Sequence, residues 1–126
     1  MAGKRKETVL QVTVTTEEDW ATLLQRKGII VVDVYSNWCG PCKPVVRHLQ
    51  RMKNEIAEDE LLHFATAESD SLEDLKEYRG QCQTVFLLYH NAQVVEKVEG
   101  PKVPAIQKAI KDQLTKVKRQ LKEGAE

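Results

Sequence analysis

The sequence lacks any long apolar run: no stretch approaches the ~18 apolar residues that a membrane-spanning helix needs. The basic beginning of the chain, Met1–Lys6, leads into an alternating segment and not into the apolar core of a signal peptide. Net charge is lacking too, because 19 Lys and Arg residues balance 19 Asp and Glu residues. These absences argue against export, and they give no reason to expect a nucleic acid or a membrane as partner.

Cysteine is scarce, with three residues at positions 39, 42 and 82. So few argue against a disulfide scaffold and are typical of a reducing, cytosolic compartment. Cys39 and Cys42 stand three residues apart, the spacing of a dithiol that opens and closes a disulfide. A structural disulfide and half of a zinc site are the alternatives. No recognisable zinc spacing joins the dithiol to the other candidate ligands, which are Cys82, His48, His63 and His90.

The apolar pattern predicts one α/β domain, a central mixed five-stranded sheet flanked by four helices in the order βαβαβαββα. We expect strands at 9–14, 29–35, 61–67, 85–89 and 93–99. We expect helices between Thr16 and Gly28, over 43–57, from Ser71 to before Gly80, and from 103 to 121. In the last helix, six apolar side chains at helical spacing should face inward: Val103, Ile106, Ile110, Leu114, Val117 and Leu121.

The strand at 29–35 is apolar on both faces except for Asp33, which indicates a central strand covered on both sides. A carboxylate there would be costly to ionise, so we expect its pKa to be raised unless backbone donors at the strand edge satisfy it. The dithiol follows at the junction with the next helix. A helix N-terminus lowers the pKa of a thiol, so Cys39 is the expected nucleophile.

Charge is unevenly distributed along the chain. The stretch 55–77 carries nine acids against the single base Lys76, and the stretch 108–122 carries six bases against the single acid Asp112. We interpret each stretch as a solvated helix face, with a docking surface for a partner as the alternative.

The segment Val32–Lys43, with Trp38 before C-G-P-C and an acid six residues before Cys39, resembles the active-site segment of thioredoxin. The resemblance runs from Thr8 to Leu121 and implies a thioredoxin domain over 8–123, a basic extension at 1–7 and a tail at 124–126. It implies that Cys39 attacks and Cys42 resolves, with Asp33 as proton acceptor. Ring and substrate groove would be formed by Trp38, Gly40, Pro41, Lys43 and the residue at position 84. No cofactor is expected beyond the redox-active Cys39–Cys42 disulfide, and an external reductase would restore the dithiol.

The chain departs from that family at the wall facing the dithiol, where Thr84 replaces a cis-proline. A cis bond before a non-proline residue costs ~2.5–4 kcal/mol, so Gln83–Thr84 is expected to be trans. Weaker substrate binding, altered specificity or easier access of metal to the thiols would follow. Cys82, close by, is either an accessory exposed thiol or a small half-buried residue. Other departures are Arg47 at the kink proline, Thr66 at a buried lysine and Ala92 at a hairpin glycine.

Three stretches, 27–35, 61–68 and 78–82, resemble the thioredoxin domain of thioredoxin–nucleoside diphosphate kinase fusion proteins of cilia and sperm tails. Thioredoxin-type light chains of outer-arm dynein are similar. Two functions follow from the resemblance. One is an oxidoreductase acting on protein disulfides in the cytoplasm. The other is a redox-sensing or structural subunit of a ciliary or flagellar axoneme, with dynein or microtubule components as partners and little general reductase activity.

Overall fold

The computed structural model describes residues 11–35, 43–56, 61–79 and 85–124. Along the chain lie β1 (Gln11–Val14), α1 (Glu17–Leu24), β2 (Ile29–Tyr35), α2 (Lys43–Ile56), β3 (Leu62–Glu68), the 3-10 helix η1 (Glu73–Tyr78), β4 (Val85–His90), β5 (Gln93–Glu99) and α3 (Val103–Gly124). This order confirms the predicted one.

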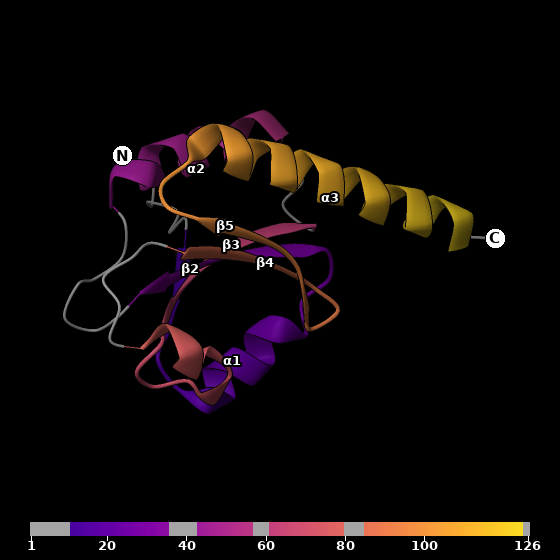
Figure 1. Ribbon diagram of the computed structural model, residues 1–126. Helices are drawn as coiled ribbons and strands as arrows, with labels where there is room; N and C mark the ends of the chain where they lie inside the picture. The colour runs from indigo at the N-terminus through magenta and orange to yellow at the C-terminus, as the bar shows by residue number, and fades with distance from the viewer. Residues whose placement is uncertain (1–10, 36–42, 57–60, 80–84, 125–126) are drawn as a thin grey trace, which may run out of the picture.

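The five strands form one sheet in the order β1-β3-β2-β4-β5. Strands β1, β3 and β2 run parallel, whereas β4 is antiparallel to β2 and β5 is antiparallel to β4. Helices α2 and α3 cover one face, and α1 and η1 cover the other (Figure 1). The mixed sheet with four flanking helices is therefore confirmed, with β2 at its centre as the apolar run predicted.

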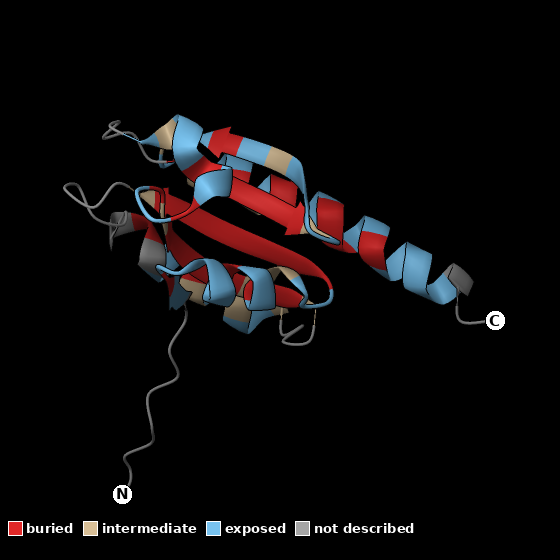
Figure 2. Ribbon diagram, turned by 90° about the horizontal axis from the view of Figure 1, so that it is seen from below, coloured by how far each residue is buried: buried red, intermediate tan, exposed pale blue. Residues whose placement is uncertain are grey.

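Alternation along the strands divides the interior into two cores. The core under α2 and α3 includes Val31, Phe64, Phe86, Leu49 and Ile110. The core on the α1 side includes Trp20, Val32, Ala65, Leu75 and Leu87. Figure 2 shows the buried strands between helices whose outer faces are exposed.

The first helix begins as predicted, because the Thr16 side chain accepts a hydrogen bond from the backbone N–H of Asp19 at 3.1 Å. It ends at Leu24 and does not extend to Gly28. Gly28 instead enters β2 with φ at +85°, where its backbone lies against that of Leu61. The absence of a side chain at Gly28 therefore allows the chain to pass close to the backbone of Leu61.

The helix predicted after Ser71 is a 3-10 helix, η1, and begins at Glu73. Leu72 stands at its N-cap and provides no side-chain hydrogen bond, and Leu75 departs from helical angles with φ −110° and ψ 16°. This turn is therefore stabilised by the burial of Leu72 and Leu75 in the core and not by regular helix geometry.

Helix α3 extends past the edge of the sheet (Figure 1). Its apolar side chains are buried as predicted from Ile106 to Val117, but Leu121 is 53% exposed. The expectation that Leu121 faces inward is therefore wrong, because the last turns of the helix have no sheet beneath them.

Candidate active site

Asp33 is buried in the sheet, with 1% of its surface exposed. It alternates with Val31 on β2 and is aligned with Phe86 of β4, and both neighbours belong to the core under α2. The carboxyl group therefore lies on the α2 face of the sheet, two residues before the end of β2. The sequence predicted this burial.

A row of hydroxyl groups runs from Asp33 toward the edge of the sheet. Thr66 of β3 is the register partner of Asp33, and Thr13 of β1 is the register partner of Thr66. Thr66 is 5% exposed, and its hydroxyl donates to that of Thr13 at 3.4 Å. Thr66 therefore stands beside the acid, as its alignment with the family's buried lysine implies.

Tyr35 ends β2 next to Glu68, its register partner on β3. Burial raises the pKa of the Tyr35 phenol, and the negative charges of Glu68 and Asp33 raise that pKa further. The backbone N–H of Ser69 donates to the Tyr35 carbonyl at 2.8 Å, which joins the ends of the two strands. This end of the sheet therefore has a negative character and a protonated phenol.

Arg79 holds the loop that follows β3. Its guanidinium group donates to the Ser69 carbonyl at 2.7 Å and to the Leu72 carbonyl at 3.1 Å. Arg79 directly precedes residues 80–84, which contain Cys82 and Thr84. Sequence reasoning assigned no role to this arginine, because its acceptors are backbone carbonyls and leave no side-chain signature.

The other predicted site residues lie outside the described part of the chain, namely Trp38, Cys39, Gly40, Pro41, Cys42, Cys82 and Thr84. Lys43 begins α2 directly after the dithiol. Helix α2 packs through Val45 and Leu49 on the sheet face that carries Asp33. The described elements thus bring together the buried acid and the helix that follows the dithiol.

Within the described ranges, no group of three or more His, Cys, Asp or Glu side chains is arranged to hold a metal ion. Among the same residues, no helix is both long and apolar enough to cross a bilayer.

Comparison with known proteins agrees with this geometry. The thioredoxin family profile matches residues 11–113. Human thioredoxin domain-containing protein 6 is 49% identical over the whole chain, which spans 38% of that protein. Human thioredoxin domain-containing protein 3 is 41% identical over 87% of the chain and 19% of its own length. The chain thus spans well under half of these relatives.

Solved thioredoxins share the architecture. A thioredoxin from Nicotiana alata superposes with a TM-score of 0.66 at 27% identity, covering 89% of this chain and 99% of the other. Oxidised mitochondrial thioredoxin 3 from Saccharomyces cerevisiae gives 0.64 at 28% identity, covering 81% and 94%. With its sheet order, its buried acid and the profile match, the chain belongs to the thioredoxin family.

Proposed function

We propose that the protein is a thiol–disulfide oxidoreductase that reduces protein disulfides through Cys39 and Cys42. The observation that carries the proposal is the burial of Asp33 on the α2 face of β2, in the strand that leads into C-G-P-C. Asp33 is 1% exposed, and buried carboxyl groups beside a reactive centre are typical of proton donors and acceptors in active sites.

In the proposed reaction, the Cys39 thiolate attacks one sulfur of a substrate disulfide. A mixed disulfide forms and one substrate thiolate leaves. Cys42 then loses its proton and attacks the Cys39 sulfur, which releases the second substrate thiol and closes the Cys39–Cys42 disulfide. Two electrons pass from the dithiol to the substrate, and an external reductase must return them.

Asp33 is the proposed acceptor of the Cys42 proton. Because burial disfavours the ionised form of a carboxyl group, we expect ionised Asp33 to accept a proton more readily than an exposed aspartate would. Uptake of the proton would neutralise Asp33 at the step in which Cys42 becomes a thiolate.

Thr84 in place of the cis-proline is expected to change the groove in which the substrate backbone lies beside Cys39. We therefore expect a narrower substrate range or weaker substrate binding than in thioredoxins with the proline. Arg79, which anchors the loop before this segment, is the described residue best placed to support that groove.

A second candidate function is a redox-sensing or structural role in a ciliary or flagellar axoneme. It is favoured by the chain's similarity to thioredoxin domain-containing proteins 3 and 6, in which the matching part is 19% and 38% of the whole. A domain joined to a larger protein can serve one fixed partner, for which dynein or microtubule components are the proposed candidates.

An insulin-reduction assay distinguishes the two functions. The oxidoreductase proposal expects turnover by the wild type, none by Cys39→Ser, and a dithiol potential near that of thioredoxin, about −270 mV. Turnover no higher than that of Cys39→Ser would contradict it. Cys42→Ser should retain the substrate as a mixed disulfide with Cys39, and the trapped protein would show whether the partner is axonemal.

A further inference from the structure

The layer formed by α2 and α3 carries most of the exposed positive charge of the described chain. Exposed bases on the two helices include Arg47, Arg51, Lys108, Lys111, Lys116, Lys118, Arg119 and Lys122. The described acids of these helices are Glu55 and Asp112, and Lys108 pairs with Asp112 at 2.8 Å. A neutral chain thus presents a basic layer on one side of its sheet.

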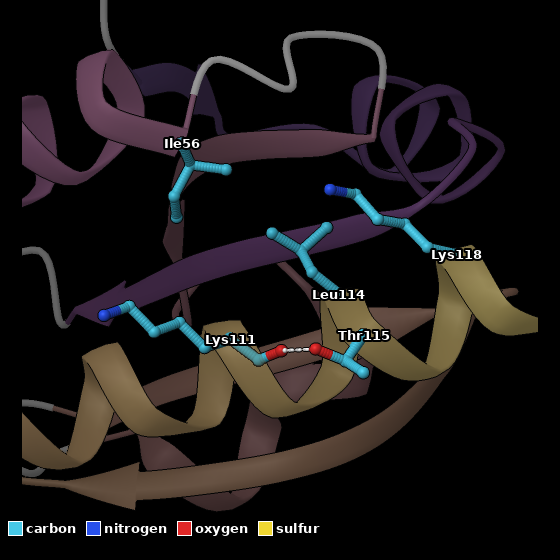
Figure 3. A pocket seen from close by; sticks show the side chains of 5 residues that line it. All are labelled: Ile56, Lys111, Leu114, Thr115 and Lys118. Carbon is cyan, nitrogen blue, oxygen red and sulfur yellow. Dashed lines mark hydrogen bonds between the residues drawn. The ribbon is translucent and has the colours of Figure 1, made fainter.

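A depression of about 350 Å³ lies in this layer, between the end of α2 and the middle of α3. We call it the α2–α3 groove, lined by Ile56, Lys111, Leu114, Thr115 and Lys118. Figure 3 shows the side chains of Lys111 and Lys118 leaving α3 on either side of Leu114, with Ile56 across from them. The groove therefore has an aliphatic floor between two ammonium groups.

Thr115 adds to the apolar floor. Its hydroxyl donates to the Lys111 carbonyl at 2.9 Å within α3, so its one hydrogen-bond donor is used inside the helix (Figure 3). What the groove offers a ligand is thus apolar contact at its centre and positive charge at its margins.

Past the groove, α3 carries Leu121, which lines a neighbouring hollow with Gly28, Leu61 and Val117. Leu121 follows Leu114 by seven residues, and Lys118 follows Lys111 by seven. Seven residues make about two helical turns, so the two leucines share one face of α3 and the two lysines share another. Leu121 is 53% exposed, the most exposed large apolar side chain described. From Lys111 to Leu121 the surface extends for about 15 Å, at ~1.5 Å per residue.

We propose that the α2–α3 groove, with Leu121, binds an acidic amphipathic helix of a partner protein. Apolar side chains on one face of the partner would pack on the partly buried Ile56 and the exposed Leu121, while Leu114, 4% exposed, closes the floor of the groove between α2 and α3. Carboxylates beside them would face Lys111 at the margin of the groove, within a layer rich in bases, which selects an acidic partner over a basic one.

Charge and chemistry favour this occupant over the others. A second copy of the chain, docked through the same face, would bring the basic α3 of each copy together. Single-stranded nucleic acid is bound on aromatic platforms, and the floor of the groove is aliphatic. An acidic protein helix satisfies both the apolar centre and the basic margins.

The proposed binding surface is separate from the proposed redox site, because Ile56 lies at the end of α2 and the dithiol directly precedes its start. The helix has 14 residues, which places Ile56 about 20 Å from its start at ~1.5 Å per residue. A partner could thus hold the protein in an assembly and leave Cys39 accessible.

Fluorescence anisotropy with a labelled peptide tests the proposal on the full chain. The probe is an amphipathic helix of about 20 residues, some 30 Å long, with leucines on one face and glutamates flanking them. A scrambled peptide of the same composition is its control. We expect saturable binding of the first peptide only, weakened as salt rises from about 50 to about 300 mM.

Variants locate the site. Lys111→Glu and Leu121→Gln should each weaken binding by about tenfold, since each costs roughly one surface interaction plus repulsion or lost apolar contact. Their matched controls are Lys116→Glu, also exposed on α3, and Val94→Gln, an apolar residue 49% exposed on β5. All four positions are exposed, and circular dichroism checks that each variant folds.

Three results would overturn the proposal: no saturable binding of the amphipathic peptide, equal loss in the variants and their controls, or equal binding of the scrambled peptide. Tighter binding of a single-stranded oligonucleotide through Lys111 would replace it with a nucleic-acid surface. Dimerisation that Leu121→Gln abolishes, without peptide binding, would replace it with a contact between copies.

Discussion

Asp33 of β2 and Thr66 of β3 are register partners in the parallel part of the sheet, and both are buried. The Thr66 hydroxyl is directed along the row to Thr13, and the partner on the other side of Asp33 is Phe86. Neither neighbour in the row is a cation. The two neighbours of Asp33 in this row therefore supply no positive charge to the buried acid.

Asp33→Asn should slow disulfide reduction at pH 7 by about tenfold. This loss is smaller than the rate gain that a general base usually provides, because a thiol also ionises without help near neutral pH. The amide cannot accept the Cys42 proton. At higher pH the deficit should shrink, since bulk base removes that proton. Initial rates from pH 6 to about 9 measure the effect, with Thr66→Val as the non-titrating control. A rate ratio independent of pH would contradict the role as base.

Thr84→Pro should raise turnover of insulin if the missing cis-proline limits the handling of substrate. The expected gain is in kcat/KM, because the change acts on the groove and leaves the dithiol intact. Thr84→Ala separates the effect of the proline ring from removal of the threonine side chain. An unchanged rate in Thr84→Pro would show that position 84 is not the limitation.

Gly28→Ala should destabilise the protein far more than Gly100→Ala. Both glycines have positive φ, +85° and +92°, so alanine costs about 1 kcal/mol of backbone strain at either. At Gly28 the new Cβ would also collide with the Leu61 backbone, whose carbonyl accepts from Ile29 N–H at 2.7 Å. At Gly100 its nearest atom is the flexible Lys102 side chain, at 3.7 Å.

Urea unfolding of the two glycine variants gives the comparison. We expect Gly28→Ala to lose at least about 3 kcal/mol more than Gly100→Ala, the range of a severe steric clash. Equal losses would mean that the Leu61 backbone moves aside at little cost.

Ala92→Gly should stabilise the β4–β5 hairpin. Asn91 and Ala92 have φ of 56° and 66°, so the alanine occupies a left-handed conformation that glycine adopts without strain. The gain should be about 1 kcal/mol. The control is Ala21→Gly in the exposed face of α1, which should instead lose about 1 kcal/mol. The same substitution thus has opposite signs at the two positions, and thermal unfolding measures both.

We expect the wild type to lose stability above pH ~10 through ionisation of Tyr89 in the unfolded chain, and Tyr89→Phe to remove that loss. Tyr89 packs edge-on against Trp20, with ring centroids 5.3 Å apart. Burial raises the pKa of the phenol well above its usual value, and the charge of Asp74 raises it further. Asp74 itself accepts a hydrogen bond from the Trp20 ring at 2.8 Å.

The sign follows from proton binding. Above pH ~10 the unfolded chain releases the Tyr89 proton while the folded chain keeps it, so the free energy of unfolding falls by up to about 1.4 kcal/mol per pH unit. This contribution is complete below that pH and is lost above it. Urea unfolding between pH 9 and about 11, compared with Tyr89→Phe, isolates it from the titration of lysines. Parallel pH profiles would show that Tyr89 has the same pKa in the folded and the unfolded chain.

Much of the fold could be predicted from local pattern. The apolar run at 29–35 matches β2, and the alternation around it places Asp33 in the interior. The site is different: its dithiol is predicted from spacing and resemblance, while the described structure contributes the acid, its neighbour Thr66 and the anchor Arg79. The arginine was missed because backbone carbonyls carry no sequence signal.

The sequence by itself determined the order of elements, the period of each strand and the spacing of the dithiol, because these depend on neighbours within a few residues. Only the tertiary structure decided that the Thr66 hydroxyl bonds to that of Thr13, that Gly28 crosses Leu61 and that Leu121 lies past the sheet. Each of these depends on chain segments that meet only after folding. The α2–α3 groove is of the same kind, since Ile56 and Lys111 share a surface only because both helices cover one face of the sheet.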